Sequence, residues 1–586
     1  MTVASHTGHF AVARRGHARI ADADVITACE RLHGGGLLDL LEPLVARDTG
    51  RPRLLTLEGL LTGMQLCADR HDGAVLLDRT TDLLQYRISP GMRTRFRIPE
   101  RPETDRGFEA AYACARRLFH TLLDALDPSP LPKNRQLDRA EADRIALAAG
   151  TRDLAERATR LQKAVGLLIE DSLTPARHLL DERWDGSIAL DATPVRTFAR
   201  GTRTTGPVTA TDPDAGWYVR EGDHRDPDDA TAPANPHAKN SGSKQSKKPS
   251  RRAKYLFGYD ATLAIARNPG RDGSPTPQGH ADPGQLPALV VGFTLDKPGH
   301  RPGPNAVNVL ADVRVRGHRP GYLAGDRAYN NTAPDAFQLP ARALGYRMVF
   351  DYRTDQLGIQ AGHAGALMIE GTWYCPAIPQ PLIDTTADLH AKRIDGETWT
   401  RRIAARVPFR LMPKQHPDAE GHQRFMCPAS AGKLQCPIKP RSLGTRPHLP
   451  LADPEPTPAG PLTVCRQHSI TIDPEAGAQH RQDLDYGGED WQRVYFRLRN
   501  SVEAFNSYAK DPAYEAIEQA GRRRIRGIAA QTLLLAFQLA HANQRKLTRW
   551  VDTLPAVGAR PRRRPTRRRP TKPLGTWTPT GHLTPV

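Results

Sequence analysis

A carboxylate flanked by two cations and an aromatic ring recurs at helical spacing in the last fifth of the sequence. The four residues, three, four and seven positions apart, are Phe496, Arg499, Glu503 and Lys510. At roughly 100° per residue they fall within an arc of about 60° on one face of a helix. A metal-dependent enzyme acting on a phosphate backbone needs such a face, but most helical charge clusters are only solvated. The stripe by itself leaves both interpretations open.

Two aspartates follow short apolar segments that are typical of strands. The segment Ile188 to Leu190 runs into Asp191 and is stopped by Pro194, and Tyr322 to Gly325 runs into Asp326. We therefore predict that each aspartate lies at the end of a strand. Because mostly parallel α/β sheets carry functional groups at the carboxyl ends of their strands, the two aspartates are expected to converge.

Three carboxylates without histidine suit a divalent cation that prefers oxygen ligands. With Glu503 on a helix packed over the same edge, Asp191 and Asp326 would form a site for Mg²⁺ or Mn²⁺. Two such ions about 3.5–4 Å apart can activate the attacking oxygen and stabilise the leaving oxygen in a phosphoryl displacement. Each aspartate taken singly could instead cap a turn or a helix. Asp260 and Asp351 also lie in or near predicted strands and are the main rivals for the two positions.

The elements that must position these residues divide the chain into five parts. Residues 1–180 have helical periodicity and are expected to form an all-α N-terminal domain, for which DNA-end binding and simple packing are about equally favoured. Residues 181–357 alternate strands and helices, with a polar stretch at 211–252 expected to be a mobile loop. Residues 358–490 are rich in proline and look like an irregular insertion. Residues 491–550 are again helical, and the Arg/Pro-rich tail from 551 to 586 is expected to be disordered.

The composition favours a polyanionic partner. The formal net charge is +19 over 586 residues, and part of it lies in the run RPRRRPTRRRPTK from Arg560 to Lys572. Lys and Arg that neutralise phosphates bind by releasing counterions, so DNA is the leading candidate. No apolar run approaches the ~20 residues that span a bilayer, and no N-terminal stretch has the pattern of a signal peptide. We expect a cytoplasmic, nucleoid-associated protein with no membrane partner.

Taken together, the three motifs resemble those of the DDE transposases of bacterial insertion sequences. The segment from Phe496 to Lys510 matches the signature Tyr-x2-Arg-x3-Glu-x6-Lys in spacing, with Phe in place of Tyr. LDATPVR around Asp191 is similar to the first-aspartate strand of that family. AGDRAYNN around Asp326 is similar to the second, which usually reads Asp-Arg-Gly-Tyr, with Ala328 in place of the glycine.

The resemblance covers residues 187–550 and implies a ribonuclease-H-like α/β catalytic core, interrupted by an insertion before the glutamate helix. It also implies Mg²⁺-dependent attack of water at the transposon end, followed by attack of the freed 3′-hydroxyl on target DNA. The implied partners are double-stranded DNA, both terminal inverted repeats and target, and a second copy of the chain in a homodimer. The residues that the family pattern assigns are Asp191, Asp326 and Glu503 as metal ligands, Arg499 and Lys510 as phosphate contacts, and Phe496 packed or stacked beside them.

Further basic residues could meet DNA. Arg327 adjoins Asp326, and a surface salt bridge is the equal alternative for it. The cluster RRRIR is predicted to start a helix just after the glutamate motif, where Arg522, Arg523 and Arg524 are candidates for backbone contacts; its alternative is a solvated helix start. Two other functions stay open: a ribonuclease-H-like nuclease that cuts DNA without strand transfer, and an inactive remnant that only binds DNA.

Cysteines in the insertion form a candidate structural Zn²⁺ site. Thiolates from a proline-rich segment with little core of its own could bind one tetrahedral ion, although no tight C-x2-C pair is present. The alternatives are four unlinked thiols, or His422 or His468 in place of one ligand. The four cysteines, of seven in the chain, are Cys375, Cys427, Cys436 and Cys465.

Overall fold

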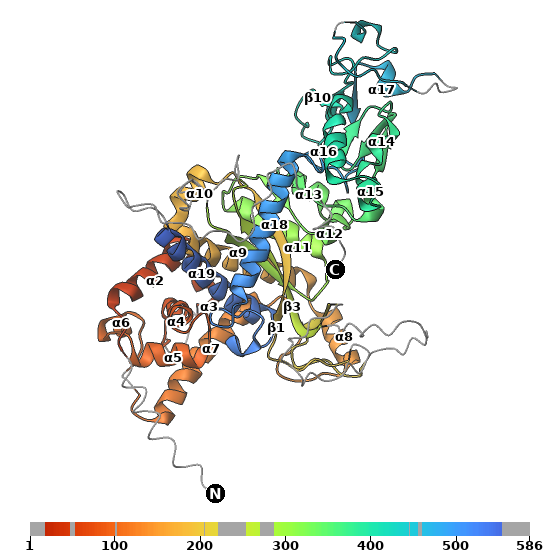
Figure 1. Cartoon of the computed structure of the whole chain (residues 1–586). Helices are drawn as coiled ribbons and strands as arrows, with labels where there is room; N and C mark the ends of the chain where they lie inside the picture. Colours follow the sequence, from red (N-terminus) through yellow and green to blue (C-terminus); the bar gives the residue numbers. More distant parts are fainter. Residues whose placement is uncertain are drawn as a thin grey trace, which may run out of the picture.

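The computed structural model describes residues 18–46, 53–99, 102–203, 206–220, 254–269, 286–444, 446–454 and 460–553. Its centre is a mixed six-stranded sheet (Figure 1). The strands follow the order β2-β3-β1-β5-β6, and β4 also pairs with β3. Pairs among β1, β2, β3 and β4 are antiparallel, whereas β5 runs parallel to β1 and to β6. The strands are β1 (Ile188–Arg196), β2 (Gly216–Arg220), β3 (Lys254–Ala266), β4 (Leu289–Asp296), β5 (Tyr322–Ala324) and β6 (Arg347–Val349).

Helices cover both faces of this sheet. Alternate residues of β1 enter different cores: Ala189 packs with helices α9, α18 and α19, whereas Ile188 and Leu190 pack with α11. Successive side chains of a strand point to opposite faces, so Asp191 shares the face of Ala189 and lies beneath α18. The helices of these layers are α9 (Thr151–Leu173), α11 (Pro302–Val315), α12 (Arg327–Asn330), α13 (Gln338–Ala343), α18 (Glu489–Ala509) and α19 (Ile528–Thr553).

The N-terminal part is helical, but its core continues into the sheet. One buried cluster holds Leu60 of α4, Ala164 of α9, Leu263 of β3 and Leu533 of α19. The all-α domain predicted for residues 1–180 therefore has no separate hydrophobic core in the described residues. Its remaining helices are α2 (Asp22–Gly34), α3 (Leu37–Val45), α4 (Leu57–Arg70), α5 (Leu77–Tyr86), α6 (Pro90–Arg95), α7 (Asp105–Leu126), α8 (Arg139–Ala148) and α10 (Arg177–Arg183).

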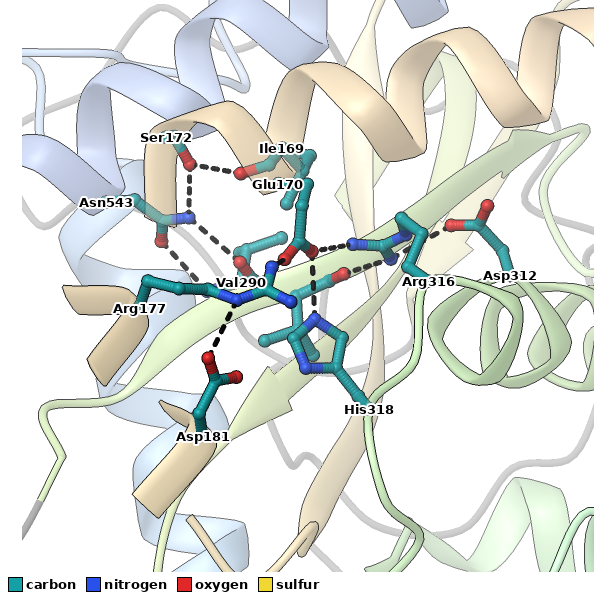
Figure 2. A network of polar contacts seen from close by, with 11 residues as sticks. Ile169, Glu170, Ser172, Arg177, Asp181, Val290, Asp312, Arg316, His318 and Asn543 are labelled. Atoms are coloured by element: carbon teal, nitrogen blue, oxygen red, sulfur yellow. Dashed lines mark hydrogen bonds and ion pairs between the residues drawn. The ribbon is translucent and has the colours of Figure 1, made fainter. Parts of the chain in front are cut away.

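A polar network ties α9 to the sheet layer (Figure 2). Glu170 Oε2 accepts a 2.6 Å hydrogen bond from Arg316 Nη1 and lies 2.9 Å from His318 Nε2. Arg316 also donates to Asp312 Oδ2 at 3.0 Å. The exposed fraction of the side chain is 6% for Arg316 and 12% for Glu170, so these ion pairs are largely shielded from water. Arg177 adds a further, more exposed ion pair to Glu170.

The insertion is folded, contrary to the irregular structure expected for it, and projects from the rest of the chain (Figure 1). Two three-stranded sheets and several short helices enclose small hydrophobic clusters of their own. Their strands have two to five residues, too short for a periodic pattern to stand out. The elements are β7 (Ile359–His363), β8 (Ala366–Ile369), β9 (Thr372–Tyr374), α14 (Gln380–Ile383), α15 (Thr385–His390), α16 (Gly396–Ala405), β10 (Met412–Pro413), β11 (Gln423–Met426), α17 (Thr463–Arg466) and β12 (Ser469–Ile472).

The predicted end of the first strand needs correction. Strand β1 does not end at Asp191 but continues through Pro194 to Arg196, because β3 pairs with it along its whole length. Strand β5 has already ended at Ala324, so Pro194 lies where no neighbour on that side needs its missing N–H.

Strand β2 lies inside the stretch 211–252 that was expected to be a loop. Its sequence Gly-Trp-Tyr-Val-Arg is rich in strand-forming residues and pairs with the first residues of β3. The rest of that stretch, and the basic tail beyond Thr553, lie largely outside the described residues. Among the helices that are described, none combines the length and apolar character needed to cross a bilayer.

Candidate active site

The register of the parallel strands brings the first two aspartates to one level. Ala189 of β1 pairs with Ala324 of β5. Asp191 lies two residues after Ala189, and Asp326 lies two residues after Ala324. Strand β5 ends one residue earlier than predicted, so Asp326 follows it by two residues, and its Oδ1 caps α12 by accepting the N–H of Ala328 at 2.9 Å. Both the metal-ligand and the helix-cap interpretations are thus compatible with its position.

Asp351, the rival of Asp326, differs from it in its hydrogen-bond partners. Ala324 pairs with Val349 of β6, so Asp351, two residues past the end of β6, lies level with Asp326. Its carboxylate accepts hydrogen bonds from Arg327 Nε and Nη2, at 3.0 and 2.8 Å, and from the Tyr486 hydroxyl at 2.7 Å. Asp351 is therefore held by neighbours, and in this structure Arg327 forms an ion pair with it.

The other rival, Asp260, lies further along the sheet. It pairs with Pro194, three residues beyond Asp191 in β1, and its Oδ2 accepts the N–H of Gly299 at 3.0 Å. Burial raises the pKa of Asp260. Its position beyond the end of β5 leaves Asp191 as the aspartate that is level with Asp326.

Two polar side chains of helix α18 contact Asp191, and a third, that of Glu503, contacts one of them. Asn506 Nδ2 donates a 2.8 Å hydrogen bond to Asp191 Oδ2. Arg499 Nη1 lies 3.8 Å from Asp191 Oδ1, and its Nη2 lies 3.2 Å from Glu503 Oε1. The exposed fraction is 17% for the Asp191 side chain and 61% for that of Glu503. Arg499 therefore bridges a shielded carboxylate and a solvent-facing one.

The site has an excess of negative charge. Burial raises the pKa of Asp191 to about 6, with Asp326 and Glu503 adding to the rise and Arg499 opposing it. Burial acts to lower the pKa of Arg499, but Asp191, Asp326 and Glu503, with a neighbouring tyrosine, raise it overall. A cation between these carboxylates would stabilise their charged forms.

The carboxylate oxygens of the site are the type of ligand that a divalent cation prefers, but their present arrangement does not form a metal site. As the side chains stand, no three His, Cys, Asp or Glu residues in the described ranges are arranged to hold a metal ion. Glu503 is turned toward Arg499 instead. Two buried atoms at the site, Arg499 Nη1 and Asn506 Oδ1, have no hydrogen-bond partner among the described residues. Such atoms are costly to leave unpaired and indicate that the site accepts a further polar group.

The outer members of the helical stripe lie to either side of Asp191. The half-buried Phe496 packs edge-on against Trp491 and Tyr495, with ring centroids 5.7 Å apart in both cases. Lys510 lies just past the end of α18, where its Nζ is 2.8 Å from Glu518 Oε1. The structure thus brings Arg499 and Glu503 of the stripe to Asp191, but not the other two.

The arginine cluster after α18 is not the predicted helix start. A 3₁₀ turn covers Ala520–Arg522, and α19 begins only at Ile528. Arg523 is completely buried and donates to Gln531 and Gln538 of α19, so the expectation that it contacts DNA is wrong. Its partners, two glutamines on the next helix, could not be predicted from the charge pattern of the cluster.

The neighbours of Arg523 have different surroundings. Arg522 donates to the carbonyl oxygens of His71 and Pro512 and so links the N-terminal helices to the segment after α18. Arg524 is exposed, with its guanidinium carbon 5.9 Å from the centre of the Phe198 ring. Of the three arginines, Arg524 is the best placed for a phosphate contact.

The sequence analysis missed Asn506 and a cationic cluster on α19. Asn506 follows Glu503 by three positions and Arg499 by seven, so it belongs to the same helical stripe. In the cluster, Lys546 and the exposed Arg549 lie together, and burial lowers the pKa of Lys546 to about 8, with nearby arginines adding to the effect. The repeated basic positions in QRKLTR were the available signal.

No family model matches the chain, and comparisons with curated proteins and with solved structures found no match either.

Proposed function

We propose that this protein is a DNA transposase of an insertion sequence, with Asp191, Asp326 and Glu503 as ligands of Mg²⁺ or Mn²⁺ in a ribonuclease-H-like core. The observation that carries the proposal is the parallel register of β1 and β5, which gives two aspartates from separate motifs the same level beneath α18. The strand order supports it as well. The antiparallel strands β1, β3 and β4, with the short β2 as an addition on β3, are followed by the parallel β5 and β6 and then by a helix with the third carboxylate, which agrees with the core that the resemblance implies.

The chemistry is displacement at phosphorus. Bound divalent cations would activate the attacking oxygen and stabilise the leaving oxygen of a phosphodiester. In the first reaction, water adds its oxygen to phosphorus at the transposon end and a 3′-hydroxyl leaves. In the second, that 3′-hydroxyl attacks a target phosphodiester and displaces another 3′-hydroxyl, so one phosphodiester forms for each one that breaks.

The chain's own residues supply orientation and charge. Asn506 fixes the Asp191 carboxylate through its hydrogen bond. In the absence of DNA, Arg499 offsets part of the charge of Asp191 and Glu503. Its planar guanidinium could also form a bidentate contact with a DNA phosphate. Lys546, Arg549 and Arg524 are further cations for phosphates outside the reacting bond.

The biological setting is part of the same proposal. We expect a homodimer that pairs the two transposon ends on the bacterial nucleoid, in the cytoplasm. The gene should then be flanked by inverted repeats that are bounded by short direct duplications of target DNA.

The test is incubation of the purified chain with labelled DNA from each flank of the gene, an unlabelled target plasmid and Mg²⁺. The proposal predicts metal-dependent cleavage at the repeat ends and labelled products joined to the plasmid. Cleavage without joined products would support the nuclease alternative. Binding without cleavage would support the inactive DNA-binding alternative.

A further inference from the structure

Four cysteines converge in the insertion from segments that are far apart in the sequence. Cys375 directly follows β9, Cys427 directly follows β11, and Cys465 lies in α17 just before β12. Cys436 lies in the loop after β11. All four are buried, with 6–8% of each residue exposed. A buried cysteine therefore lies at or near an end of a strand in each of the two small sheets of the insertion.

Three of these cysteines occupy the same position in a proline turn. The carbonyl oxygen of Cys375 accepts the N–H of Ile378 at 3.1 Å, and that of Cys436 accepts the N–H of Lys439 at 2.9 Å. The carbonyl of Cys427 accepts the N–H of Ala431 at 2.9 Å. Proline after each cysteine restricts the backbone of the turn, so each of these cysteines stands at the first position of a defined turn.

Hydrogen bonds hold these corners together. The N–H of Cys427 donates to the carbonyl of His468 at 3.0 Å, which joins the turn after β11 to the start of β12. Lys439 Nζ donates to the carbonyls of Arg466 and Gln467, at 3.1 and 3.2 Å, which joins the Cys436 turn to the end of α17. The side chains of Cys375, Cys427 and Cys436 also share one buried cluster.

The thiols are close enough to affect one another's ionisation. Burial raises the pKa of Cys375 to about 12, and the nearby Cys427, Cys465 and Cys436 add to this rise. Burial likewise raises the pKa of Cys465 to about 11, with Cys427 and Cys436 adding to it. The N–H of Ala377 has the opposite effect on the pKa of Cys375, because it donates to the sulfur and stabilises the thiolate.

We infer that Cys375, Cys427, Cys436 and Cys465 bind one Zn²⁺ ion that stabilises the insertion. Four thiolates satisfy the tetrahedral preference of zinc for sulfur ligands. The histidines that could replace a cysteine have other partners: His422 lies 3.6 Å from Asp418, and His468 Nδ1 lies 3.3 Å from Ser430 Oγ.

The hydrophobic cluster around these cysteines is small, so a bound metal would add to its stability. The buried cluster around Cys375 has eleven residues, of which three are cysteines. So small a core gains much of its stability from a staple such as a metal ion. The described side chains do not yet form a coordinating group of three. Coordination requires loss of the thiol protons and rotation about Cα–Cβ, which leaves the backbone turns in place.

Metal analysis of the purified full chain tests this inference without any DNA activity. We expect about one zinc per chain, falling by more than about half in Cys436→Ser and in Cys465→Ser. Cys114→Ser, a half-buried cysteine of α7, is the matched control and should keep the zinc, as should Asp191→Asn, which alters the carboxylate site. A zinc-free wild-type protein, or full zinc content in both cysteine variants, would overturn the inference.

A cysteine variant could also lose zinc by misfolding, so a second measurement uses the wild-type chain. Protein expressed with Co²⁺ should show intense visible bands of tetrahedral cobalt and a near-ultraviolet sulfur-to-cobalt charge-transfer band. Weak bands typical of six oxygen ligands, without charge transfer, would show that the cysteines do not bind the ion. Either result is independent of whether the chain cleaves DNA.

Discussion

The Nδ2 group of Asn506 donates a 2.8 Å hydrogen bond to Asp191 Oδ2 across 315 residues of sequence. This bond joins α18 to β1 on the same carboxylate that Arg499 approaches at 3.8 Å. It thereby fixes the helix over the level at which Asp326 follows β5. The position of Glu503 relative to both aspartates depends on this contact.

Replacing Asn506 by alanine should slow DNA cleavage without unfolding the protein. A hydrogen bond to a charged group contributes about 1.5–3 kcal/mol. If that energy orients Asp191 for reaction, the cleavage rate should fall roughly 10- to 100-fold. Single-turnover cleavage of labelled end DNA measures this effect, and Ser507→Ala, at the exposed next position, is the control. Equal rates for the two variants would show that Asn506 does not support the site.

Asp191 should make the metal-free protein less stable as the pH rises. Its pKa is about 6 in the folded protein and near 3.8 in the unfolded chain, so the folded state binds more protons between these values. The free energy of unfolding should therefore fall from about pH 4 to pH 6 and stay low above it. Asp191→Asn removes this cost and should be more stable than wild type by on the order of 2–3 kcal/mol at pH 8.

Urea unfolding in the presence of a chelator, at pH 4 and pH 8, measures the Asp191 effect. The difference between variant and wild type should nearly vanish at pH 4. Excess Mg²⁺ at pH 8 should stabilise wild type more than Asp191→Asn. A constant difference at both pH values would contradict the raised pKa.

The sequence predicted elements best where the apolar pattern was long. The runs with a long apolar pattern, at residues 254–266, 108–126 and 155–168, lie within β3, α7 and α9 respectively. The strands of the insertion were missed because runs of two to five residues carry no clear period. The continuation of β1 past Asp191 was missed because it depends on pairing with β3, a long-range contact.

The candidate site was predictable in its residues rather than in its contacts. Spacing along one helix identified Arg499 and Glu503, and Asn506 lay on the same stripe. The contacts of the other polar residues depend on partners that no local pattern reveals. Asp351, for example, pairs with Arg327, and Arg523 donates hydrogen bonds to two glutamines. Charge alone therefore selected arginines that prove to be structural.

Adjacent arginines should have opposite effects. Arg523→Ala leaves the buried acceptors of Gln531 and Gln538 without their donor and should destabilise the fold by about 3 kcal/mol. Arg524→Ala should leave stability unchanged within about 0.5 kcal/mol. If Arg524 contacts a phosphate, its variant should lower the salt dependence of DNA binding by about one unit of log–log slope. Thermal unfolding and binding at several salt concentrations separate the two roles.

In the network of Figure 2, two arginines pair with the same carboxylate, and their substitutions can be compared. Arg316→Ala removes a shielded partner of Glu170 and Asp312 and should cost about 3–5 kcal/mol. Arg177, whose side chain is 47% exposed, also pairs with Glu170, but Arg177→Ala should cost about 1 kcal/mol or less. Urea unfolding of both variants checks this, and similar losses would mean that the shielding of Arg316 is unimportant.

If the proposed function is correct, Glu503 acts with Asp191 and Asp326 in one metal-dependent site. The most direct measurement compares Glu503→Gln with Asp490→Asn, an exposed carboxylate change on the same helix, in the cleavage and joining assay. Glu503→Gln should lose both reactions by about 100-fold or more while binding end DNA within about twofold of wild type, and Asp490→Asn should retain both. Wild-type cleavage and joining by Glu503→Gln would contradict the account.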